Sequence, residues 1–221
     1  MEKKLSGWGN NIFAHSKVYF PKNITDIKKL IKRKTIARGL GRSYGDSSIQ
    51  PNSTIITSKL NKVLSFDFKK GILEAEAGIS IEAILKIIVK KGWFLEVTPG
   101  SKQITLGGMI ASNVHGKNHH KFGNFKNCII NFKIINEKKK LITCTKNNNK
   151  KIFDYTVGGM GLTGIIYSCK FKLKKIDSDI ILQQKIKNRN LRETINSIKA
   201  SNDWDYNVAW IDTSAQKEQL G

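Results

Sequence analysis

Residues 98–120 read TPGSKQITLGGMIASNVHGKNHH, a glycine-rich run that ends in polar side chains. Glycine brings no side chain to a hydrophobic core and costs backbone entropy, so this much glycine indicates another purpose. That purpose is close approach, because bare backbone N–H groups can reach a large, flat or anionic ligand. We interpret the run as a ligand cradle followed by the residues that face the chemistry. A glycine-rich connection with surface histidines is the alternative.

A second glycine-rich motif, GLGRSYGD at residues 39–46, follows a short predicted strand at residues 35–38. Its glycines permit positive φ and can leave backbone amides pointing inward, which makes a nest for phosphate. Arg38, Arg42 and Ser43 add charge or hydrogen-bond donors. The motif is neither a Walker A loop, because no Gly-Lys-Ser/Thr follows, nor GxGxxG, because three residues separate its last two glycines. A plain surface loop is the alternative reading.

A third motif has the GxGxxG spacing but the wrong context. Gly159, Gly161 and Gly164 fit the pattern, yet residues 165–173 form a strand-like run of Ile, Tyr, Cys and Phe. A dinucleotide fingerprint must lie between a strand and a helix. We therefore exclude a Rossmann site and predict a glycine loop that enters a strand beside a ligand.

Composition bounds the class of protein. The 221 residues carry a formal net charge of +22, which suits nucleic acid, an acidic membrane surface or an anionic ligand. The excess is dispersed lysine in an Ile- and Asn-rich chain, so an A/T-rich coding bias explains it equally well. Cys128, Cys144 and Cys169 form no CxxC and are predicted to be buried thiols. Since there is no apolar leader and no run of about 20 apolar residues, we expect a cytoplasmic protein.

Hydrophobic periodicity predicts two helices in the body of the chain, one from Asn23 and one from Ser80 that ends before Gly92. Strands are predicted at residues 18–20, 35–38, 54–57, 63–68, 72–77, 128–135, 141–145 and 165–173. Residues 147–151 read as a polar loop. The C-terminal part is predicted as a strand at 179–186, a helix at 191–200 and a strand at 206–211.

These motifs together resemble the FAD-binding domain of the vanillyl-alcohol-oxidase flavoproteins in order and spacing. The matching segments are ARGLGRSYGD (37–46), the helix and GW (81–93), TPGSKQITLGG (98–108), HGKNHH (115–120) and VGGMGLTGII (157–166). The pair RGLGRSYGD and HGKNHH is the specific part, and it is most similar to the decaprenylphosphoryl-ribose oxidases of that superfamily. The resemblance covers nearly the whole chain.

The resemblance implies an α+β fold, a two-lobed PCMH-type FAD-binding domain at residues 1–176. A small mixed sheet would form the lobe at about 1–67, and a larger antiparallel sheet with flanking helices the lobe at 68–176. Residues 177–221 would begin an incomplete substrate-binding domain. Because members of this family are longer, we expect a fragment or a chain that a partner completes.

The resemblance also implies a set of site residues. Those expected around the FAD pyrophosphate are Ala37, Arg38, Gly39, Leu40, Gly41, Arg42, Ser43, Tyr44, Gly45, Asp46 and Ser47. Those expected along the rest of the cofactor are Gly100, Thr105, Leu106, Gly107, Gly108, Ser112, Asn113, Val114, His115 and Ile166. Tyr44, His115 and Lys117 are the expected catalytic residues beside the flavin ring.

The expected chemistry is oxidation of a sugar hydroxyl, with hydride transfer to flavin N5. The implied substrate is the 2-hydroxyl of a prenylphosphoryl ribose, oxidised to the 2-keto form as the first step of epimerisation to arabinose. A short-chain reductase would complete that reaction, and the basic surface would suit an anionic membrane. Relatives with covalent flavin often carry histidine where this chain has Arg42, so FAD is expected to be non-covalent.

Three alternatives remain. An aldonolactone or alditol oxidase would share the FAD domain but act on a soluble sugar. A basic module that binds nucleic acid would owe its affinity to charge and lose it steeply with salt. A metal site at His115, His119 and His120 is disfavoured, because Gly116 interrupts the turn and no acidic ligand accompanies the histidines.

Overall fold

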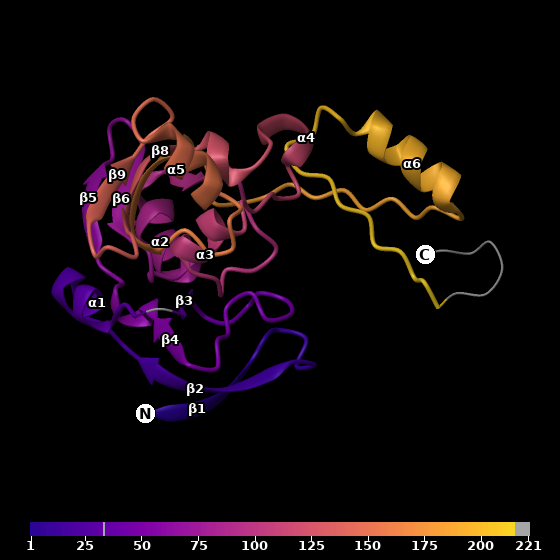
Figure 1. The fold of residues 1–221 in the computed structure, drawn as a ribbon. Coiled ribbons are helices and arrows are strands. Elements are labelled where there is room, and N and C mark those ends of the chain that lie inside the picture. Colours follow the sequence, from indigo (N-terminus) through magenta and orange to yellow (C-terminus); the bar gives the residue numbers. More distant parts are fainter. Residues whose placement is uncertain (33, 215–221) are drawn as a thin grey trace.

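A computed structural model describes residues 1–32 and 34–214 and contains two sheets, followed by an extended C-terminal arm (Figure 1). No helix in these ranges has both the length and the apolar character needed to cross a bilayer. The smaller sheet lies below the larger one in Figure 1, and the arm projects from the larger one. The architecture is the predicted α+β arrangement of a small mixed sheet and a larger antiparallel sheet.

The smaller sheet has four strands in the order β1-β2-β4-β3. They are β1 (Glu2–Ser6), β2 (Phe13–Tyr19), β3 (Thr35–Arg38) and β4 (Ser53–Ile56). β4 pairs in parallel with β2 and β3, whereas β1 and β2 form an antiparallel hairpin. The helix α1 (Ile24–Leu30) begins as predicted at Asn23, whose side chain accepts the Asp26 N–H at 2.9 Å.

The hairpin was only partly predicted. The predicted strand at 18–20 is the end of β2, and β1 was not predicted at all. The reason is visible in the burial pattern: of the five residues in β1 only Leu5 is buried, so the strand lacks the apolar alternation that marks a half-buried strand.

The larger sheet has six strands in the order β5-β6-β10-β8-β9, with β7 also paired to β10. They are β5 (Val63–Asp67), β6 (Ile72–Glu76), β7 (Trp93–Leu95), β8 (Ile129–Ile135), β9 (Leu141–Cys144) and β10 (Ile165–Lys175). All pairings are antiparallel, as predicted. Since β5 belongs to this sheet, the chain changes sheet before Val63, earlier than the expected lobe boundary at about residue 67.

Helices cover one face of the larger sheet: α2 (Ile81–Ile88), α3 (Leu106–Ala111) and α5 (Lys150–Thr156). α2 begins at its predicted cap, with the Ser80 Oγ accepting the Ala83 N–H at 3.1 Å. α5 corrects the predicted polar loop at 147–151. Its N-cap residue, Asn149, has a φ of 51° and makes no side-chain cap hydrogen bond, so the usual start signal is missing.

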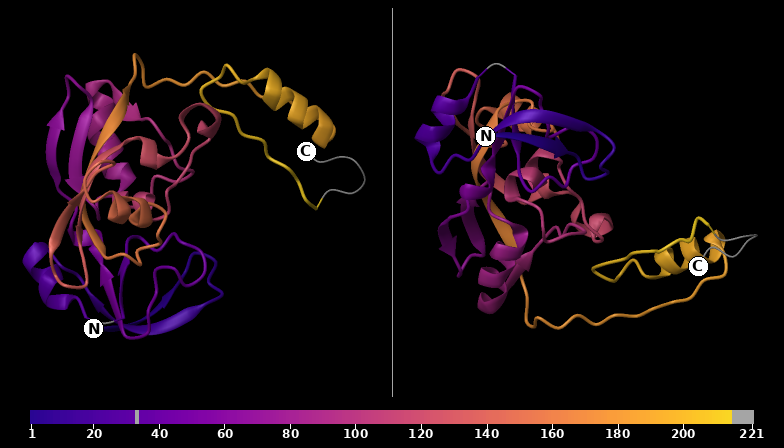
Figure 2. Two further views of the ribbon diagram at one scale, coloured as in Figure 1. Left: turned by 45° about the horizontal axis from the view of Figure 1, so that its top comes forward. Right: turned by 90° about the horizontal axis from the view of Figure 1, so that it is seen from below.

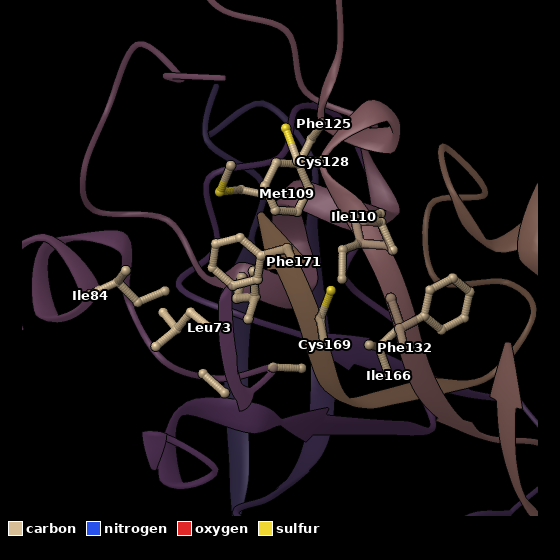
Figure 3. Close-up of a cluster of buried hydrophobic side chains, with 14 of the residues drawn as sticks. Leu73, Ile84, Met109, Ile110, Phe125, Cys128, Phe132, Ile166, Cys169 and Phe171 are labelled. Carbon is tan, nitrogen blue, oxygen red and sulfur yellow. The ribbon is translucent and has the colours of Figure 1, made fainter. Parts of the chain in front are cut away.

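The main core lies between these helices and the sheet (Figure 3). Phe132 of β8 stacks on Phe153 of α5 with ring centroids 5.3 Å apart, and Phe125 packs against Phe171 of β10 at 5.5 Å. Each such aromatic pair contributes about 0.5–1.5 kcal/mol of stability beyond the contribution of the apolar area that it buries. The three cysteines lie in this core as free thiols, as predicted, and burial raises the pKa of Cys128 to about 12.

A second core joins the two sheets. Ile27 and Ile31 from the α1 region meet Ile135 at the end of β8 and Ile165 at the start of β10. Because these side chains are almost fully excluded from water, the smaller sheet is held against one end of the larger sheet. This contact fixes the two walls of the cleft described below.

The arm, residues 177–214, leaves the end of β10, forms α6 (Leu191–Ala200) and returns toward α4 (His119–Phe122) (Figures 1 and 2). The helix was predicted, but the strands predicted at 179–186 and 206–211 are not formed. Ile180 and Leu182 are more than four-fifths exposed, and the arm has no neighbouring strand within the described chain. A β-forming sequence without a partner cannot make a ladder.

Candidate functional site: a cleft between the two sheets

A cleft lies where the smaller sheet meets α3 and β10. It opens to solvent, and its lining is mostly apolar with a few charged and polar groups, as in small-molecule and cofactor sites. Its lining comes from six parts of the chain: the end of β3 with the following loop, α3 with its flanks, the loop before β10, β10 itself, and the single residues Thr57 and Ala77. The two glycine-rich motifs therefore face one another across it.

The first wall is the loop at residues 39–45, which we name the nest loop. Within the described residues, no backbone N–H from Leu40 to Gly45 donates a hydrogen bond to the protein. Gly41 and Gly45 have φ values of 70° and 59°, a region that costs other residues about 1 kcal/mol or more. The loop thus presents free donors, which is the property required for anion binding.

Arg38 supports this loop from beneath. Its Nη2 donates to the Ser6 carbonyl at 2.8 Å, and its Nη1 to the Ser48 Oγ at 3.2 Å. A Cβ on Gly41 would overlap the guanidinium, so only glycine lets the loop pass over it. Burial, and then the charge of Arg42, lower the pKa of Arg38. The two guanidinium groups repel each other, and a bound anion would offset that repulsion.

Arg42 spans the mouth of the cleft. Its Nε donates to the Gln103 carbonyl at 3.3 Å and its Nη2 to the Gln103 Oε1 at 3.2 Å. Among the residues that the structure describes, neither Arg38 nor Arg42 pairs with a carboxylate. The positive charge at this end of the cleft is therefore uncompensated by the protein.

The second wall, residues 105–116, uses its glycines differently. Thr105 caps α3 by accepting the Gly108 N–H at 3.1 Å, and the Gly107 N–H donates to the Ala77 carbonyl at 2.7 Å. A Cβ on Gly107 would lie 3.1 Å from Ala77, whereas one on Gly116 would collide with the Thr98 carbonyl. The N–H groups of Gly107 and Gly108 are therefore already bonded within the protein, although both residues line the cleft.

The rest of this wall is small and apolar. Ala111, Val114 and Ile166 line the cleft beside Gly108 and Ser112, and Met160 closes it from the loop before β10. The cleft therefore offers free N–H donors and uncompensated charge at one end and a flat, apolar surface at the other. Those features fit an elongated ligand with an anionic part and a large aromatic part.

Most of the predicted cofactor residues line the cleft. They are Ala37, Arg38, Gly39, Leu40, Gly41, Arg42, Ser43, Ser47, Thr105, Gly107, Gly108, Ser112, Val114 and Ile166. Tyr44, Gly45, Asp46, Gly100, Leu106, Asn113 and His115 are not among the lining residues. Leu106 is fully buried in the main core, and Asn113 turns its Oδ1 to the Lys126 N–H at 3.2 Å.

The three predicted catalytic residues also lie outside this lining. Tyr44 is 74% exposed on the nest loop, and His115 and Lys117 are exposed between α3 and α4. The His115 ring contacts the His119 ring at 5.3 Å between centroids. In the described ranges, no three His, Cys, Asp or Glu side chains gather as metal ligands.

Some lining residues were not predicted: Ser48, Thr57, Ala77, Ile104, Ala111, Met160, Gly161 and Gly164. Gly161 and Gly164 belong to the motif that the sequence placed beside a ligand, so a signal was present for them. The contributions of Thr57 and Ala77 depend on how strands from two sheets meet, and no local pattern marks them.

Comparison with known proteins identifies the family. Residues 16–145, more than half of the chain, match the FAD binding domain family. Decaprenylphosphoryl-beta-D-ribose oxidase of Mycolicibacterium smegmatis is 30% identical over 99% of this chain and 50% of its own length. A putative D-arabinono-1,4-lactone oxidase of Neurospora crassa is 22% identical over 75% of this chain and 31% of its own. L-gulonolactone oxidase of Bos taurus is 23% identical over 74% and 38%.

The chain thus spans half or less of the length of the curated relatives it matches. The matched region contains the nest loop and residues 105–114 of the second wall, and the two-sheet architecture is the one expected of this family. On these grounds the chain belongs to the PCMH-type FAD-binding domain family.

Proposed function

We propose that this chain forms the FAD-binding part of an oxidoreductase that oxidises the 2-hydroxyl of a prenylphosphoryl ribose to a ketone. The single observation that carries the FAD site is the cleft, whose uncompensated arginines and free loop amides face a small, apolar wall. The substrate class rests on the relative that matches along 99% of the chain, a decaprenylphosphoryl-ribose oxidase. The aldonolactone oxidases match a smaller share at lower identity.

In this proposal the nest loop holds the FAD diphosphate. The free N–H groups from Leu40 to Gly45 donate to phosphate oxygens, and Arg38 and Arg42 neutralise their charge. Val114 and Ile166 supply apolar contact for the ring system, and exclude water from it. When bound, FAD supplies the acceptor for the hydride that leaves the carbinol carbon.

Substrate handling falls to the exposed residues between α3 and α4. Lys117 makes no ion pair within the described residues, so its ammonium is available for the phosphate of a prenylphosphoryl sugar. In this proposal His115 accepts or orients the hydroxyl proton, and Tyr44 contributes from the nest loop. Binding and orientation are the roles we assign to these three side chains.

We further propose that FAD is held without a covalent bond. Arg42 stands where covalent relatives often carry histidine, and a guanidinium is not a nucleophile at neutral pH. All three cysteines are buried in the core, away from the cleft lining. Affinity would then depend on the charges and donors of the nest loop.

The proposed partners follow from the substrate. A short-chain reductase would reduce the ketone to complete the epimerisation, and lysine-rich surfaces would attract the chain to an anionic membrane. The alternative of a basic module for nucleic acid predicts binding that falls steeply with salt. Binding of nucleic acid by surface charge alone would not explain why the cleft has one charged end and one apolar end.

Two measurements test the proposal in sequence. The first is fluorescence titration of FAD with the purified chain, in which saturable quenching is expected; no binding of FAD would overturn the cofactor assignment. The second uses a chain extended to the length of its relatives, mixed anaerobically with a prenylphosphoryl ribose or with L-gulono-1,4-lactone. Loss of the oxidised flavin bands with the first compound supports the substrate class, whereas loss with the lactone alone would contradict it.

A further inference from the structure

The turn of the β1–β2 hairpin, residues 7–12, packs on the nest loop, although the motifs that define the cofactor site do not include it. The Trp8 N–H donates to the Ser43 carbonyl at 2.8 Å. A Cβ on Gly7 would overlap the Gly45 carbonyl, so the turn and the loop are in direct backbone contact. The Ser6 carbonyl accepts from Arg38, as described above. Gly7 and Trp8 therefore contact the nest loop directly, and Ser6 contacts Arg38 beneath it.

Trp8 adds a side-chain contact. The Arg42 guanidinium carbon lies 4.6 Å from the centroid of the Trp8 ring, within the range of a cation–π contact. On its other side the same guanidinium donates two hydrogen bonds to Gln103, so that Arg42 forms a bridge between Trp8 and Gln103. Arg42 is thus held between the ring of Trp8 and the two carbonyl oxygens of Gln103.

Gln103 is itself fixed. Its N–H donates to the Ser101 Oγ at 3.1 Å, and the neighbouring Ile104 carbonyl accepts the Ile81 N–H of α2 at 2.9 Å. The far end of the Arg42 bridge is therefore anchored to the body of the larger lobe. An exposed arginine loses rotamer freedom when it binds an anion, and this bridge removes much of that loss in advance.

We propose that Trp8 is a positioning residue for the cofactor: it holds Arg42 across the mouth of the cleft and so sets the affinity for the FAD diphosphate. The inference rests on the proposed FAD site. Trp8 does not line the cleft, so it acts through Arg42 rather than by touching the cofactor. An unrestrained Arg42 would turn into solvent, and the nest loop would lose one of its two charges.

The test is a double-mutant cycle on the dissociation constant of FAD, measured by fluorescence titration of the 221-residue chain. Trp8→Ala is expected to weaken binding about two- to five-fold, the range of an exposed cation–π contact. Trp8→Phe is expected to restore part of the loss, because it keeps an aromatic face, whereas Trp8→Leu is not. In an Arg42→Gln background, Trp8→Ala is expected to have no further effect.

Phe13→Ala is the matched control, because Phe13 lies on the same hairpin, is similarly exposed and makes its own cation–π contact with Lys4 at 4.4 Å. Phe13→Ala should leave the FAD affinity at the wild-type value, and its melting temperature should match those of the Trp8 variants. Equal FAD affinity of Trp8→Ala and wild type, or additive effects of Trp8→Ala and Arg42→Gln, would overturn the positioning role. Absence of FAD binding by the wild-type chain would instead overturn the proposed function.

Discussion

The two glycine-rich walls of the cleft look alike in sequence and differ in what their glycines do. In the nest loop, residues 39–45, the backbone N–H groups from Leu40 to Gly45 have no protein acceptor within the described chain. In the α3 wall, residues 105–116, the N–H groups of Gly107 and Gly108 are already bonded, and the missing side chains let the backbone pack closely. Glycine content alone therefore does not reveal which segment binds an anion.

The difference divides the roles expected of the two walls. Changes to the donors and charges at the nest loop should reduce ligand affinity more than stability, because the N–H groups from Leu40 to Gly45 make no hydrogen bond within the described chain. Changes in the α3 wall should reduce stability, because its glycines are packed against other backbone groups. The predictions below test this division, beginning with the largest expected effect.

Gly116→Ala should destabilise the fold by about 3 kcal/mol, since its Cβ would collide with the backbone carbonyl of Thr98. For a chain of this size that corresponds to a fall in melting temperature of about 6–12 °C. The measurement is thermal unfolding followed by circular dichroism. Gly100→Ala is the control, because a Cβ there meets nothing within 4 Å, and its melting temperature should equal that of wild type. Equal melting temperatures of both variants would refute the packing role.

Arg38→Gln should weaken FAD binding about ten- to a hundred-fold, the range expected for a lost charged hydrogen bond to phosphate. The same variant should lower the melting temperature by only a few degrees, because Gln keeps part of the packing under Gly41. Fluorescence titration and thermal unfolding give the two values. A large fall in stability with unchanged affinity would reverse the division between the walls.

Thr105→Ala should cost about 1 kcal/mol, because Thr105 caps α3 through the hydrogen bond from the Gly108 N–H. Thr105→Ser keeps the acceptor oxygen and should recover most of that loss. Chemical denaturation of the two variants measures the difference. If the alanine and serine variants were equally stable, the side chain would not be acting as a cap.

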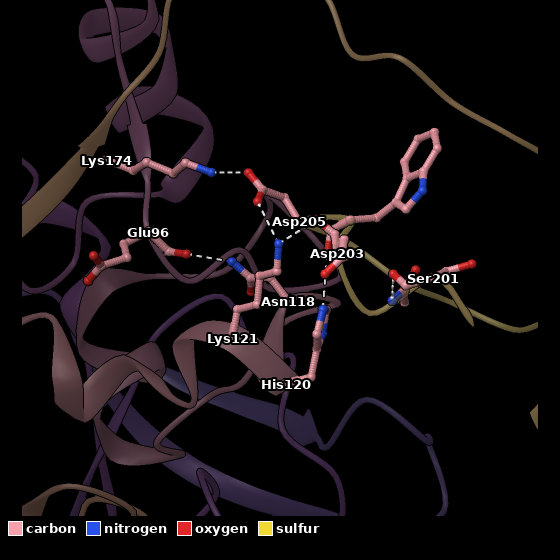
Figure 4. Close-up of polar contacts among 10 residues, drawn as sticks. Glu96, Asn118, His120, Lys121, Lys174, Ser201, Asp203 and Asp205 are labelled. Carbon is pink, nitrogen blue, oxygen red and sulfur yellow. Dashed lines mark hydrogen bonds and ion pairs between the residues drawn. The ribbon is translucent and has the colours of Figure 1, made fainter. Parts of the chain in front are cut away.

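A smaller effect is expected at the arm, where Asp205 pairs with Lys174 and Lys121 beside α4 (Figure 4). The Lys174 and Lys121 hydrogen bonds hold the pKa of Asp205 below its usual range. Because the pKa of this carboxyl is lower in the docked state, the ion pairs stabilise docking fully at pH values above the ordinary aspartate pKa. That stabilisation is lost as the pH falls through the lowered pKa of the docked state. The arm should therefore stay docked at neutral pH and release below about pH 4.

The measurement is hydrogen exchange of the Asn207 backbone N–H, followed by NMR. This N–H donates to the Lys117 carbonyl at 2.9 Å. Asp205→Asn should speed its exchange with solvent at pH 7, with FAD affinity unchanged. Asp203→Asn is the control, because Asp203 contributes its backbone carbonyl to Lys121 rather than its carboxylate. Identical exchange in both variants would show that the ion pairs do not hold the arm.

The sequence was sufficient for the elements that carry local signals. The caps at Asn23 and Ser80, every strand of the larger sheet except β7, and the nest loop could be predicted, because each depends on residues close together in the chain. The loop before β10 was predicted to lie beside a ligand, and Met160 and Gly161 line the cleft.

What could not be predicted depends on distant partners. β1 forms only because β2 lies beside it, and the strands predicted in the arm fail because no strand lies beside them in the described chain. The bridge from Trp8 through Arg42 to Gln103 joins residues up to 95 positions apart, which no local spacing indicates. The burial of Leu106 likewise follows from the packing of α3 on the sheet.

The central claim is that this cleft binds FAD without a covalent bond. The most direct measurement is the visible absorbance spectrum of the chain after incubation with FAD and gel filtration, followed by acid precipitation. We predict two flavin bands that travel with the protein and pass into the supernatant when it is precipitated. Colour that stays in the pellet would contradict non-covalent binding, and a colourless protein that leaves FAD fluorescence unchanged would contradict the cofactor site itself.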